Sequence, residues 1–487
     1  MHHDHHEVRQ VRAVAEPSSS TEAGAEADWL HNFTFDDLAL GDAASITRTL
    51  TEADLNGFAA VSGDMNPTHL DDTYARGEGL PGRTAHGMWG GALISTLLGT
   101  VFPGPGTVYV EQHLSFLAAA RIGDTLDVSA RVTARDAATG RVMLDCAVTR
   151  RGDGTCLVRG DAVVQAPQHR QRVPRHSGLR LRVFDASAGL QRLLAQATRF
   201  GSLRCAVVHP CDAESLRGAL DAAAHRLFVP VIVAPAERIR AIAAEAGLDL
   251  GAAVLEDVPH SHAAAERAAA LAAAGEVQAL MKGSLHTDEL MKAVLSRPEL
   301  RTARRLSHVF RFDVPAYPKP LLVTDAAMNI APTLDDKVHI VQNAIDLARL
   351  LGVERPKVAV LAAVEGVNAK MACTLDAAAL SKMADRGQIT GGLVDGPLAF
   401  DNAISADAAR TKGIVSPVAG DPDILMVPDL VSGNILAKQL EYLGGATGSG
   451  LVMGARVPIA LTSRADGAQA RLASAALAVI AAHGARA

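Results

Sequence analysis

The chain is poor in aromatic residues and in cysteine, and it has no long apolar run. Phe, Trp and Tyr make up 3% of its 487 residues, so the stacked aromatic platforms that bind single-stranded nucleic acid are not expected. The five cysteines are odd in number and form no Cys-x-x-Cys motif, which disfavours a disulfide framework or a structural zinc site and favours the reducing cytoplasm. The Ala-rich stretch 472–482 is too short to span a bilayer.

The charges of the chain are nearly balanced, and its N-terminal segment is polar. Lysine and arginine number 47 and aspartate and glutamate 53, which gives a net charge of −6. A mildly acidic protein has no general electrostatic attraction to nucleic acid or to anionic membranes. The first residues, MHHDHHEVRQVR, lack the apolar segment that a signal peptide needs, and the sequence contains no P-loop motif. We therefore expect a cytoplasmic protein that binds neither nucleic acid nor membranes.

Two different patterns of apolar and polar residues divide the chain into a smaller and a larger domain. Residues 1–26 are polar and rich in Ser, Ala and Gly, and are predicted to be a disordered tail. In residues 107–167 apolar and polar residues alternate, with short turns between the runs, which predicts an antiparallel sheet. The preceding stretch 84–101 is apolar on most sides, as expected of a helix that a curved sheet wraps. The sequence thus predicts an α+β domain over 27–167.

A basic, proline-containing segment at 168–180 is predicted to be a linker. Beyond it, over 181–487, apolar strand-like runs such as CAVVHP, LFVPVIVA and KVAVLAAVE alternate with Ala-rich helical stretches. This alternation is typical of a doubly wound α/β fold with a mostly parallel sheet. A length of about 300 residues is large for one such domain, so we expect two lobes.

The segment SGDMNPTHLD at 62–71 places a carboxylate and an imidazole on either side of a turn. Asp64 and His69 flank Asn66-Pro67, a pair that favours a turn. A turn there can bring both side chains to one water molecule, so that one group takes its proton and the other positions it. The spacing alone is equally compatible with an Asp-capped turn that carries a surface histidine.

The same segment resembles the signature of the MaoC-like (R)-specific enoyl-CoA hydratases, which have the hot-dog fold, a long helix wrapped by an antiparallel sheet. The resemblance covers about residues 30–167, and the string AHGM follows the motif at the family's usual distance. It implies that Asp64 and His69 activate the water that adds to a trans-2-enoyl thioester, with Asn66 in the substrate site. It also implies that Gly87, near the start of the hot-dog helix, donates its main-chain N–H to the thioester oxygen.

Other residues of this first domain receive simpler interpretations. His86 is interpreted as a turn residue, and Met88 and Trp89 as core or acyl-pocket residues. Two alternatives stay open, because the hot-dog fold also serves thioesterases and because such domains dimerise readily through sheet edges. In the second alternative the domain is a non-catalytic assembly or CoA-binding module.

Four strings in the larger domain each lie after a predicted strand or at a helix start, where doubly wound sheets place ligands. They are MKGSLHT at 281–287, DGPLAFDNAIS at 395–405, DPDILMVPDLVSGNILAK at 421–438 and RVPIALTSRAD at 456–466. Ser463 and Arg464 combine a hydroxyl with a planar, bidentate anion binder. The other candidate substrate-binding residues of these strings are Lys282, Gly283, Thr287, Asp395, Asp401 and Asn434.

Together the four strings resemble the phosphate acetyltransferase and butyryltransferase family, over about residues 181–487. The resemblance implies a two-lobed α/β fold of the isocitrate dehydrogenase type and the exchange of an acyl group between CoA and phosphate. CoA thioesters, acyl phosphate and phosphate are then substrates, and neither a bound cofactor nor a metal is expected. The implied step is direct attack of the CoA thiolate on an acyl phosphate, with Ser463 and Arg464 stabilising the transition state.

One position departs from the acetyl-type pattern of that family. Seven residues after Ser463, where acetyl-type members carry an acid, this chain has Ala470, and its TSRAD segment is closer to the butyryl type. Asp395 and Asp401 are the alternative general bases. The whole sequence predicts a bifunctional enzyme, an enoyl-CoA hydratase fused to a phosphate acyltransferase. The resemblance implies dimers for both domains, so a homo-oligomer of two or more protomers is expected.

Overall fold

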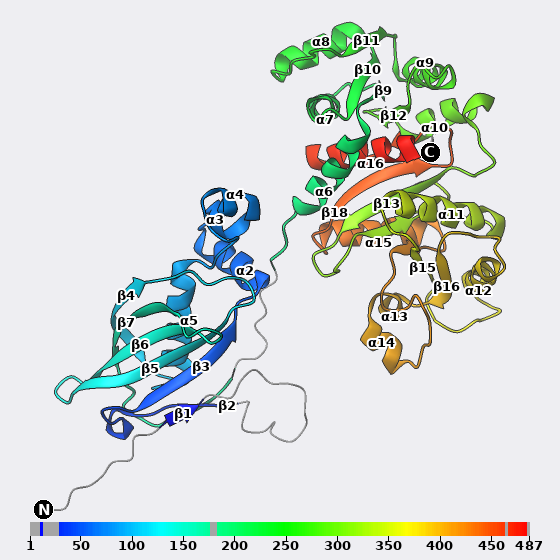
Figure 1. The fold of residues 1–487 in the computed structure, drawn as a ribbon. Coiled ribbons are helices and arrows are strands. Elements are labelled where there is room, and N and C mark those ends of the chain that lie inside the picture. The colour runs from blue at the N-terminus through cyan, green and yellow to red at the C-terminus, as the bar shows by residue number, and fades with distance from the viewer. Residues whose placement is uncertain (1–9, 13–28, 176–182, 463–465, 485–487) are drawn as a thin grey trace, which may run out of the picture. The chain divides into compact units, whose positions relative to one another are not determined.

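The protein is described by a computed structural model, which covers residues 10–12, 29–175, 183–462 and 466–484. The chain forms two compact units, Met1–Val183 and Phe184–Ala487, which are considered separately (Figure 1). The predicted catalytic residues Ser463 and Arg464 lie outside the described residues, as does most of the predicted tail 1–26.

The first unit is built around one six-stranded sheet, with the strand order β1-β3-β5-β6-β7-β4. Strands β5, β6 and β7 form the predicted antiparallel meander, and β4 pairs with the far side of β7. A separate two-stranded sheet joins β2 to β8. The elements are β1 Gln10–Arg12, β2 Trp29–His31, η1 Phe35–Asp37, β3 Ala43–Thr49, α2 Glu52–Ser62, α3 Pro67–Leu70, α4 Asp72–Gly77, α5 Gly87–Thr100, β4 Val108–Phe116, β5 Thr125–Asp136, β6 Arg141–Arg150, β7 Cys156–Gln165 and β8 Arg172–Pro174.

Helix α5 is the central helix of this unit and packs against β3, β4, β5 and β6 (Figure 1). Its residues Trp89, Leu93, Ile94, Leu97 and Leu98 are buried, and the inward residues of the strands complete the same core. Because the helix is apolar on most sides, it is stable only where a sheet covers it. The predicted hot-dog arrangement of a wrapped helix is confirmed.

Two short strands lie where the sequence predicts irregular chain. Gln10–Arg12, within the predicted tail, forms β1 and pairs in parallel with Ala43–Ser45 of β3. Arg172–Pro174, within the predicted linker, forms β8 and pairs with β2. Pairing of this kind uses main-chain groups of an otherwise unpaired strand edge, so it needs no apolar side-chain pattern that a sequence could reveal.

The second unit contains one eleven-stranded sheet, in the order β11-β10-β9-β12-β19-β18-β13-β14-β17-β15-β16. Neighbouring strands are parallel within two portions of this sheet. The first portion is β11-β10-β9-β12-β19, and the second is β14-β17-β15-β16. The antiparallel strands β18 and β13 join these two portions. The expected two-lobed α/β fold is confirmed, and its sheet is mixed because of the joining strands.

The helices and strands of this unit alternate along the chain as the apolar runs predict. They are α6 Ala188–Ala197, η2 Thr198–Phe200, β9 Leu203–Val208, α7 Ala213–Ala224, β10 Phe228–Ala234, α8 Ala236–Glu245, β11 Val254–Asp257, α9 Ser261–Ala273, β12 Ala279–Lys282, α10 Thr287–Leu295, η3 Pro298–Leu300, β13 Ser307–Asp313, β14 Leu321–Thr324, α11 Leu334–Leu350, β15 Lys357–Leu361, α12 Ala372–Asp385, β16 Leu393–Leu398, α13 Phe400–Ile404, α14 Ala406–Thr411, β17 Ile424–Met426, α15 Leu430–Tyr442, β18 Thr447–Met453, β19 Ile459–Ala460 and α16 Ala468–Gly484.

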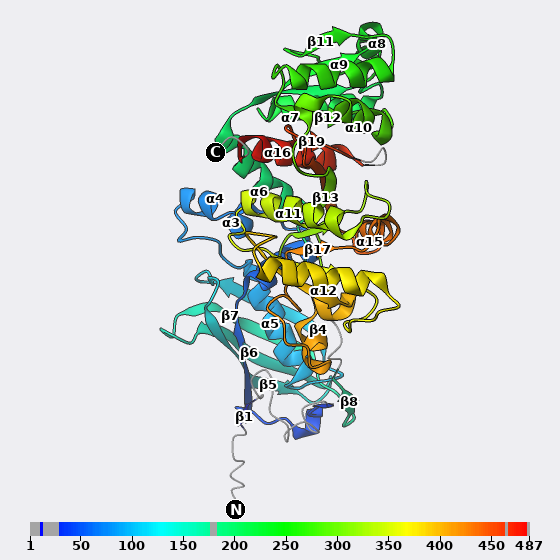
Figure 2. The same ribbon diagram turned by 90° about the vertical axis from the view of Figure 1, so that its right-hand side faces the viewer.

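Helix α16 is the buried helix of the second unit. It lies among the other elements of this unit (Figure 2) and packs against α6, α7 and β18. Its residues from Arg471 to Ala482 are all buried. The Ala-rich sequence allows this close packing, because small side chains let neighbouring elements approach the helix on every side. No helix in the described part of the chain combines the length and the apolar character of a bilayer-spanning segment.

Candidate active sites

The turn between α2 and α3 carries the first predicted site. Helix α2 ends at Ser62, and Gly63 follows with a φ of 75°, a left-handed conformation that suits glycine after a helix. Asn66 caps α3 by accepting a hydrogen bond from the Thr68 N–H, and Pro67 is the first residue of that helix. The side chain of Asn66 is therefore engaged in holding the turn, with Asp64 before it and His69 after it.

Asp64 and His69 lie close together, and His86 completes the cluster. One side-chain nitrogen from each histidine and one carboxylate oxygen of Asp64 lie within 4.8 Å of one another. His69 Nδ1 lies 2.8 Å from the main-chain oxygen of Thr84, and His86 Nε2 lies 3.0 Å from that of Asp64. The ring centroids of His69 and His86 are 3.8 Å apart. The structure thus brings Asp64 and His69 together, which is one of the two arrangements that the spacing allows.

The interpretation of His86 as a turn residue is incomplete. His86 immediately precedes α5, but its side chain is 3% exposed and lies between His69 and the ring of Phe58. Its distance from Asp64 in the sequence hid this contact, which forms only when the start of α5 packs against the turn after α2. The neighbouring Trp89 is a core residue, whereas Met88 is 57% exposed and lies outside the core.

Gly87 begins α5 beside this cluster, where its main-chain N–H lies in the first turn of a 14-residue helix. The first N–H groups of a helix have no partner within it, and they carry the positive end of the helix dipole. A Cβ atom added at Gly87 would lie 3.2 Å from the Phe116 ring, tighter than ordinary packing. Glycine therefore allows the Phe116 ring to pack against the start of α5.

The second predicted site lies partly at the carboxyl ends of β9, β12 and β19, which are parallel neighbours. Lys282 is the last residue of β12 and is buried, with Nζ 3.3 Å from the Gly283 oxygen. Thr287 is the first residue of α10. From β9 the chain proceeds to β10 on one side, while β12 lies on the other side, which is the switch point where such sheets place ligands.

Gly283 lies against the main chain that follows β9. A Cβ atom there would be 2.5 Å from the Val208 oxygen and 2.6 Å from the His209 oxygen. The next residue, Ser284, donates from Oγ to the same His209 oxygen at 2.8 Å. His209 itself has a φ of 52°, and burial is the main cause that lowers the pKa of its side chain. His209 is not among the residues predicted for this site. Only a glycine allows the two loops to approach this closely.

Strand β19 leads toward the predicted serine and arginine. Ile459 and Ala460 pair with Leu280 and Met281 of β12, so the chain leaves β19 at the same sheet edge as Lys282. Thr462, the residue before Ser463, accepts a 3.0 Å hydrogen bond from Arg471 Nη1. Arg471 is 2% exposed and was not predicted, although it directly follows Ala470, the position that departs from the acetyl-type pattern.

The remaining predicted residues lie in the second parallel portion of the sheet. Asp395 is in β16, where its Oδ1 accepts a 2.9 Å hydrogen bond from the Gly396 N–H. Asp401 is in α13 and pairs with Lys412 at 3.0 Å, and the hydrogen bond from Lys412 is the main cause that lowers the pKa of this carboxyl. A lowered pKa disfavours Asp401 as the base for a thiol. Asn434, in α15, donates to the Ala326 oxygen at 3.3 Å.

His308 lies between segments of both portions and was also missed. It is fully buried on β13, and burial lowers its pKa to about 4, while the charge of Asp325 opposes the shift. A Cβ atom on Gly450 would lie 2.5 Å from His308 Nε2 and 2.4 Å from the Leu461 oxygen, so the imidazole is close to the segment that leads to Ser463. A single histidine in an apolar strand gave no sequence signal of this position.

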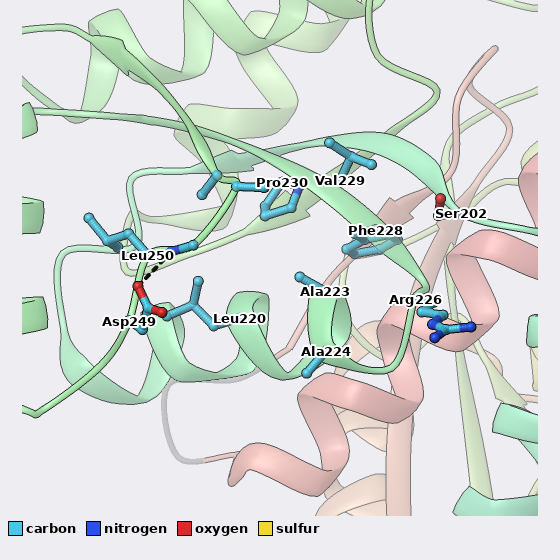
Figure 3. A pocket seen from close by; sticks show the side chains of 13 residues that line it. Ser202, Leu220, Ala223, Ala224, Arg226, Phe228, Val229, Pro230, Asp249 and Leu250 are labelled. Atoms are coloured by element: carbon cyan, nitrogen blue, oxygen red, sulfur yellow. Dashed lines mark hydrogen bonds between the residues drawn. The ribbon is translucent and has the colours of Figure 1, made fainter.

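A cavity of about 460 Å³ lies at the opposite ends of β9 and β10, at their amino ends (Figure 3). Leu220, Phe228, Pro230 and Leu250 line its apolar part, with Arg226 and Asp249 among the polar residues (Figure 3). Of the predicted site residues that the structure describes, none lines this cavity. Lys282 and Gly283 lie instead at the carboxyl end of β12.

Comparisons with known proteins assign both parts of the chain to families. The family model "Phosphate acetyl/butaryl transferase" matches residues 253–479, and the model "MaoC like domain" matches residues 42–148. The chain is 58% identical over 290 residues to a phosphate acetyltransferase of Rhizobium meliloti, covering 59% of this chain and 92% of that protein. It is 54% identical over 203 residues to a probable phosphate butyryltransferase of Bacillus subtilis, covering 42% and 68%.

A solved structure gives the same assignment for the second unit. A branched-chain phosphotransacylase from Enterococcus faecalis is 32% identical, with a TM-score of 0.52, over 58% of this chain and 99% of that chain. Fold, sequence identity and coverage agree for this part. The chain therefore belongs to the phosphate acetyl/butyryltransferase family and carries a MaoC-like domain in its N-terminal part.

Proposed function

We propose that the chain is a bifunctional acyl-CoA enzyme. Its first unit hydrates a short trans-2-enoyl-CoA to an (R)-3-hydroxyacyl-CoA, and its second unit transfers a short acyl group between CoA and phosphate. The observation that carries the hydratase is the cluster of Asp64, His69 and His86 beside the start of α5. The transferase rests on the sequence identity to a protein named phosphate acetyltransferase.

The hydrogen bonds of the cluster determine which nitrogen of His69 can act as a base. Because a main-chain oxygen can only accept, His69 Nδ1 donates its proton to Thr84, and Nε2 keeps its lone pair. Nε2 takes a proton from water while the water oxygen bonds to C3 of the substrate. Asp64 orients this water and offsets the positive charge that develops on the ring. His69 then returns the proton to C2, so that one water adds across the double bond.

The negative charge of the reaction collects on the thioester oxygen before C2 is protonated. We propose that the N–H of Gly87 binds that oxygen, and the position of Gly87 in the N-terminal turn of α5 supports this role. The Phe116 ring, which would contact any side chain at this position, forms a wall beside it. Asn66 acts indirectly, since its side chain caps α3 and so fixes the turn that carries the two catalytic groups.

For the transferase, the CoA thiolate attacks the acyl carbon of an acyl phosphate and inorganic phosphate leaves with the bonding electrons. We propose that Arg464 binds the phosphate oxygens and that Ser463 donates to the charge that develops in the transition state. Lys282, with Gly283 and Thr287, supplies a cation and main-chain donors at the sheet edge next to β19. Asp395 and Asn434 are proposed substrate contacts from the second portion of the sheet.

The hydratase is tested by mixing the purified chain with crotonyl-CoA, without phosphate, and following the loss of the enoyl-thioester absorbance. We expect a loss without release of free thiol, and we expect Asp64→Asn to abolish it. Release of thiol at the same rate would indicate a thioesterase. An unchanged absorbance in the wild-type chain would refute the hydratase and leave an assembly or CoA-binding module.

The assembly alternative has an observation of its own. Strand β4 is an edge strand, and Val108, Val110 and Phe116 on it are 60%, 42% and 51% exposed. An edge with exposed apolar residues is a surface suited to pairing with a second chain. We therefore propose a homo-oligomer of two or more protomers, which light scattering of the full chain measures. Assembly and hydration are compatible, so the absorbance experiment decides whether assembly is the only role.

The transferase is tested by supplying acetyl phosphate or butyryl phosphate with CoA and measuring thioester formation. Arg464→Ala should abolish both conversions, because the ammonium group of Lys282 cannot replace the bidentate contact of a guanidinium with phosphate. Comparison of the two acyl phosphates at equal concentration gives the acyl preference. Full activity of Arg464→Ala would contradict the role assigned to this residue.

A further inference from the structure

His86 has a nitrogen that the proposed mechanism does not use. The side chain is 3% exposed, and its Nε2 lies 3.0 Å from the Asp64 main-chain oxygen. Among the described residues, its other nitrogen, Nδ1, is buried and has no hydrogen-bond partner. A buried polar atom left without a partner is destabilising, and such atoms are uncommon in folded proteins unless a water or ligand satisfies them.

The contact to Asp64 fixes what this second nitrogen can do. The Asp64 oxygen accepts, so His86 Nε2 carries the proton and donates it. In the neutral ring Nδ1 then holds a lone pair and can only accept a hydrogen bond. The same logic leaves the lone pair of His69 on Nε2, because its Nδ1 donates to Thr84. Each histidine is therefore oriented by a main-chain oxygen and presents one acceptor.

The spacing of the cluster suits a single oxygen atom. One ring nitrogen of each histidine and one carboxylate oxygen of Asp64 lie within 4.8 Å of one another, so an oxygen atom between them would be within about 2.8 Å of all three, which is hydrogen-bond distance. A water molecule is held well when it has two to four polar partners. Asp64, His69 and His86 can supply three.

We propose that His86 is a third catalytic residue of the hydratase site, which holds the attacking water through Nδ1 and fixes Asp64 through Nε2. The proposal rests on the hydratase function proposed above. The water donates one proton to His69 as its oxygen bonds to C3, and its second hydrogen stays on the new hydroxyl, hydrogen-bonded to His86. His86 itself gains and loses no proton, so the balance of the reaction is unchanged.

Three variants of the full chain separate the two contacts. His86→Gln places an amide N–H near the Asp64 oxygen and removes the Nδ1 acceptor. His86→Asn places an amide oxygen near the position that Nδ1 occupies in the wild type, and it removes the contact to the Asp64 oxygen. His86→Phe keeps a ring beside His69 and removes both. The control is His113→Phe, because His113 is on β4 of the same unit and its side chain is 66% exposed.

The test measures kcat and KM for crotonyl-CoA and the thermal unfolding midpoint of each variant. His86→Phe should lower kcat by about a hundredfold, the cost of a misplaced reacting group, with KM within threefold. His86→Gln and His86→Asn should each lose about tenfold, which corresponds to one hydrogen bond. His113→Phe should match the wild type. A normal unfolding midpoint shows that a loss of kcat does not arise from misfolding.

With an active wild-type chain, two sets of results overturn the assignment. One is a folded His86→Phe variant with kcat within threefold of the wild type, or with a raised KM and a normal kcat. The other is equal loss in all three His86 variants, which would mean that neither nitrogen has a separate role. An inactive wild-type chain refutes the hydratase function and the assignment together. An active wild type with an active His86→Phe refutes the assignment alone.

Discussion

Replacing Gly283 by alanine tests whether the switch point between β9 and β12 is part of the transferase site. A Cβ atom at this position would lie 2.5 Å from the Val208 oxygen and 2.6 Å from the His209 oxygen. Contacts of a Cβ atom below 3.0 Å are essentially never seen, and both neighbours are main-chain atoms. The segment that follows β9 and the segment that follows β12 must therefore separate by at least about 0.5 Å. Both are tied to packed strands, so their main-chain atoms cannot simply rotate out of the way.

This separation acts on catalysis more than on folding. Inserting a methyl group into a packed position costs about 1–3 kcal/mol of stability, which a domain of this size survives. A shift of this kind displaces Lys282 and the start of α10, and misplacement by about 1 Å can lower a rate by about a hundredfold. Because the expected shift is smaller than about 1 Å, we expect Gly283→Ala to lower the transferase kcat by about ten- to a hundredfold.

The assay follows thioester formation from acyl phosphate and CoA, with hydration of crotonyl-CoA by the same chain as the internal control. The matched variant is Gly366→Ala, since a Cβ atom added at Gly366 meets nothing within 4 Å. Gly366→Ala and the hydration rate should both remain normal. If Gly283→Ala retains transferase kcat within threefold of the wild type, the switch point is not part of the reacting site.

Three further predictions concern the second unit. Asp401→Asn should leave transferase kcat within twofold, because Lys412 already holds Asp401 as an anion of low pKa; a hundredfold loss would make Asp401 the base after all. Arg471→Met should lower kcat at least tenfold, because Thr462 loses its 3.0 Å donor, and Arg471→Lys should recover only part of it for want of the planar fork; a normal Arg471→Met enzyme would exclude this role. Since burial lowers the pKa of His308 from 6.5 to about 4, the unfolded chain binds a proton in this range that the folded chain does not. Stability of the second unit should therefore be complete above pH 6.5 and fall as the pH approaches 4, which unfolding midpoints would show, and a His308→Gln variant with the same pH dependence would point to another group.

The repeating patterns of the sequence determined both architectures. Alternation over 107–167 specifies strands with one buried face, and the apolar stretch at 84–101 specifies a helix that must be covered, because each pattern follows directly from side-chain geometry. The turn at Asn66-Pro67 is equally local, so the spacing allowed the proximity of Asp64 and His69 that the structure shows, although it did not exclude a surface histidine. Local rules sufficed wherever the interacting residues are near one another in the chain.

Tertiary structure alone decided the contacts between distant segments. His86 reaches Asp64 across 22 residues, and Ser284 reaches the His209 oxygen across 75, because helix packing and strand pairing bring their chains together. Arg471 meets Thr462 only because α16 is buried against the sheet that β19 belongs to. The hydrophobic periodicity of the sequence does not predict such contacts, since each contact depends on where a whole helix or strand packs. The residue types that could do chemistry were visible in the sequence, and the packing of the elements decided which of them meet.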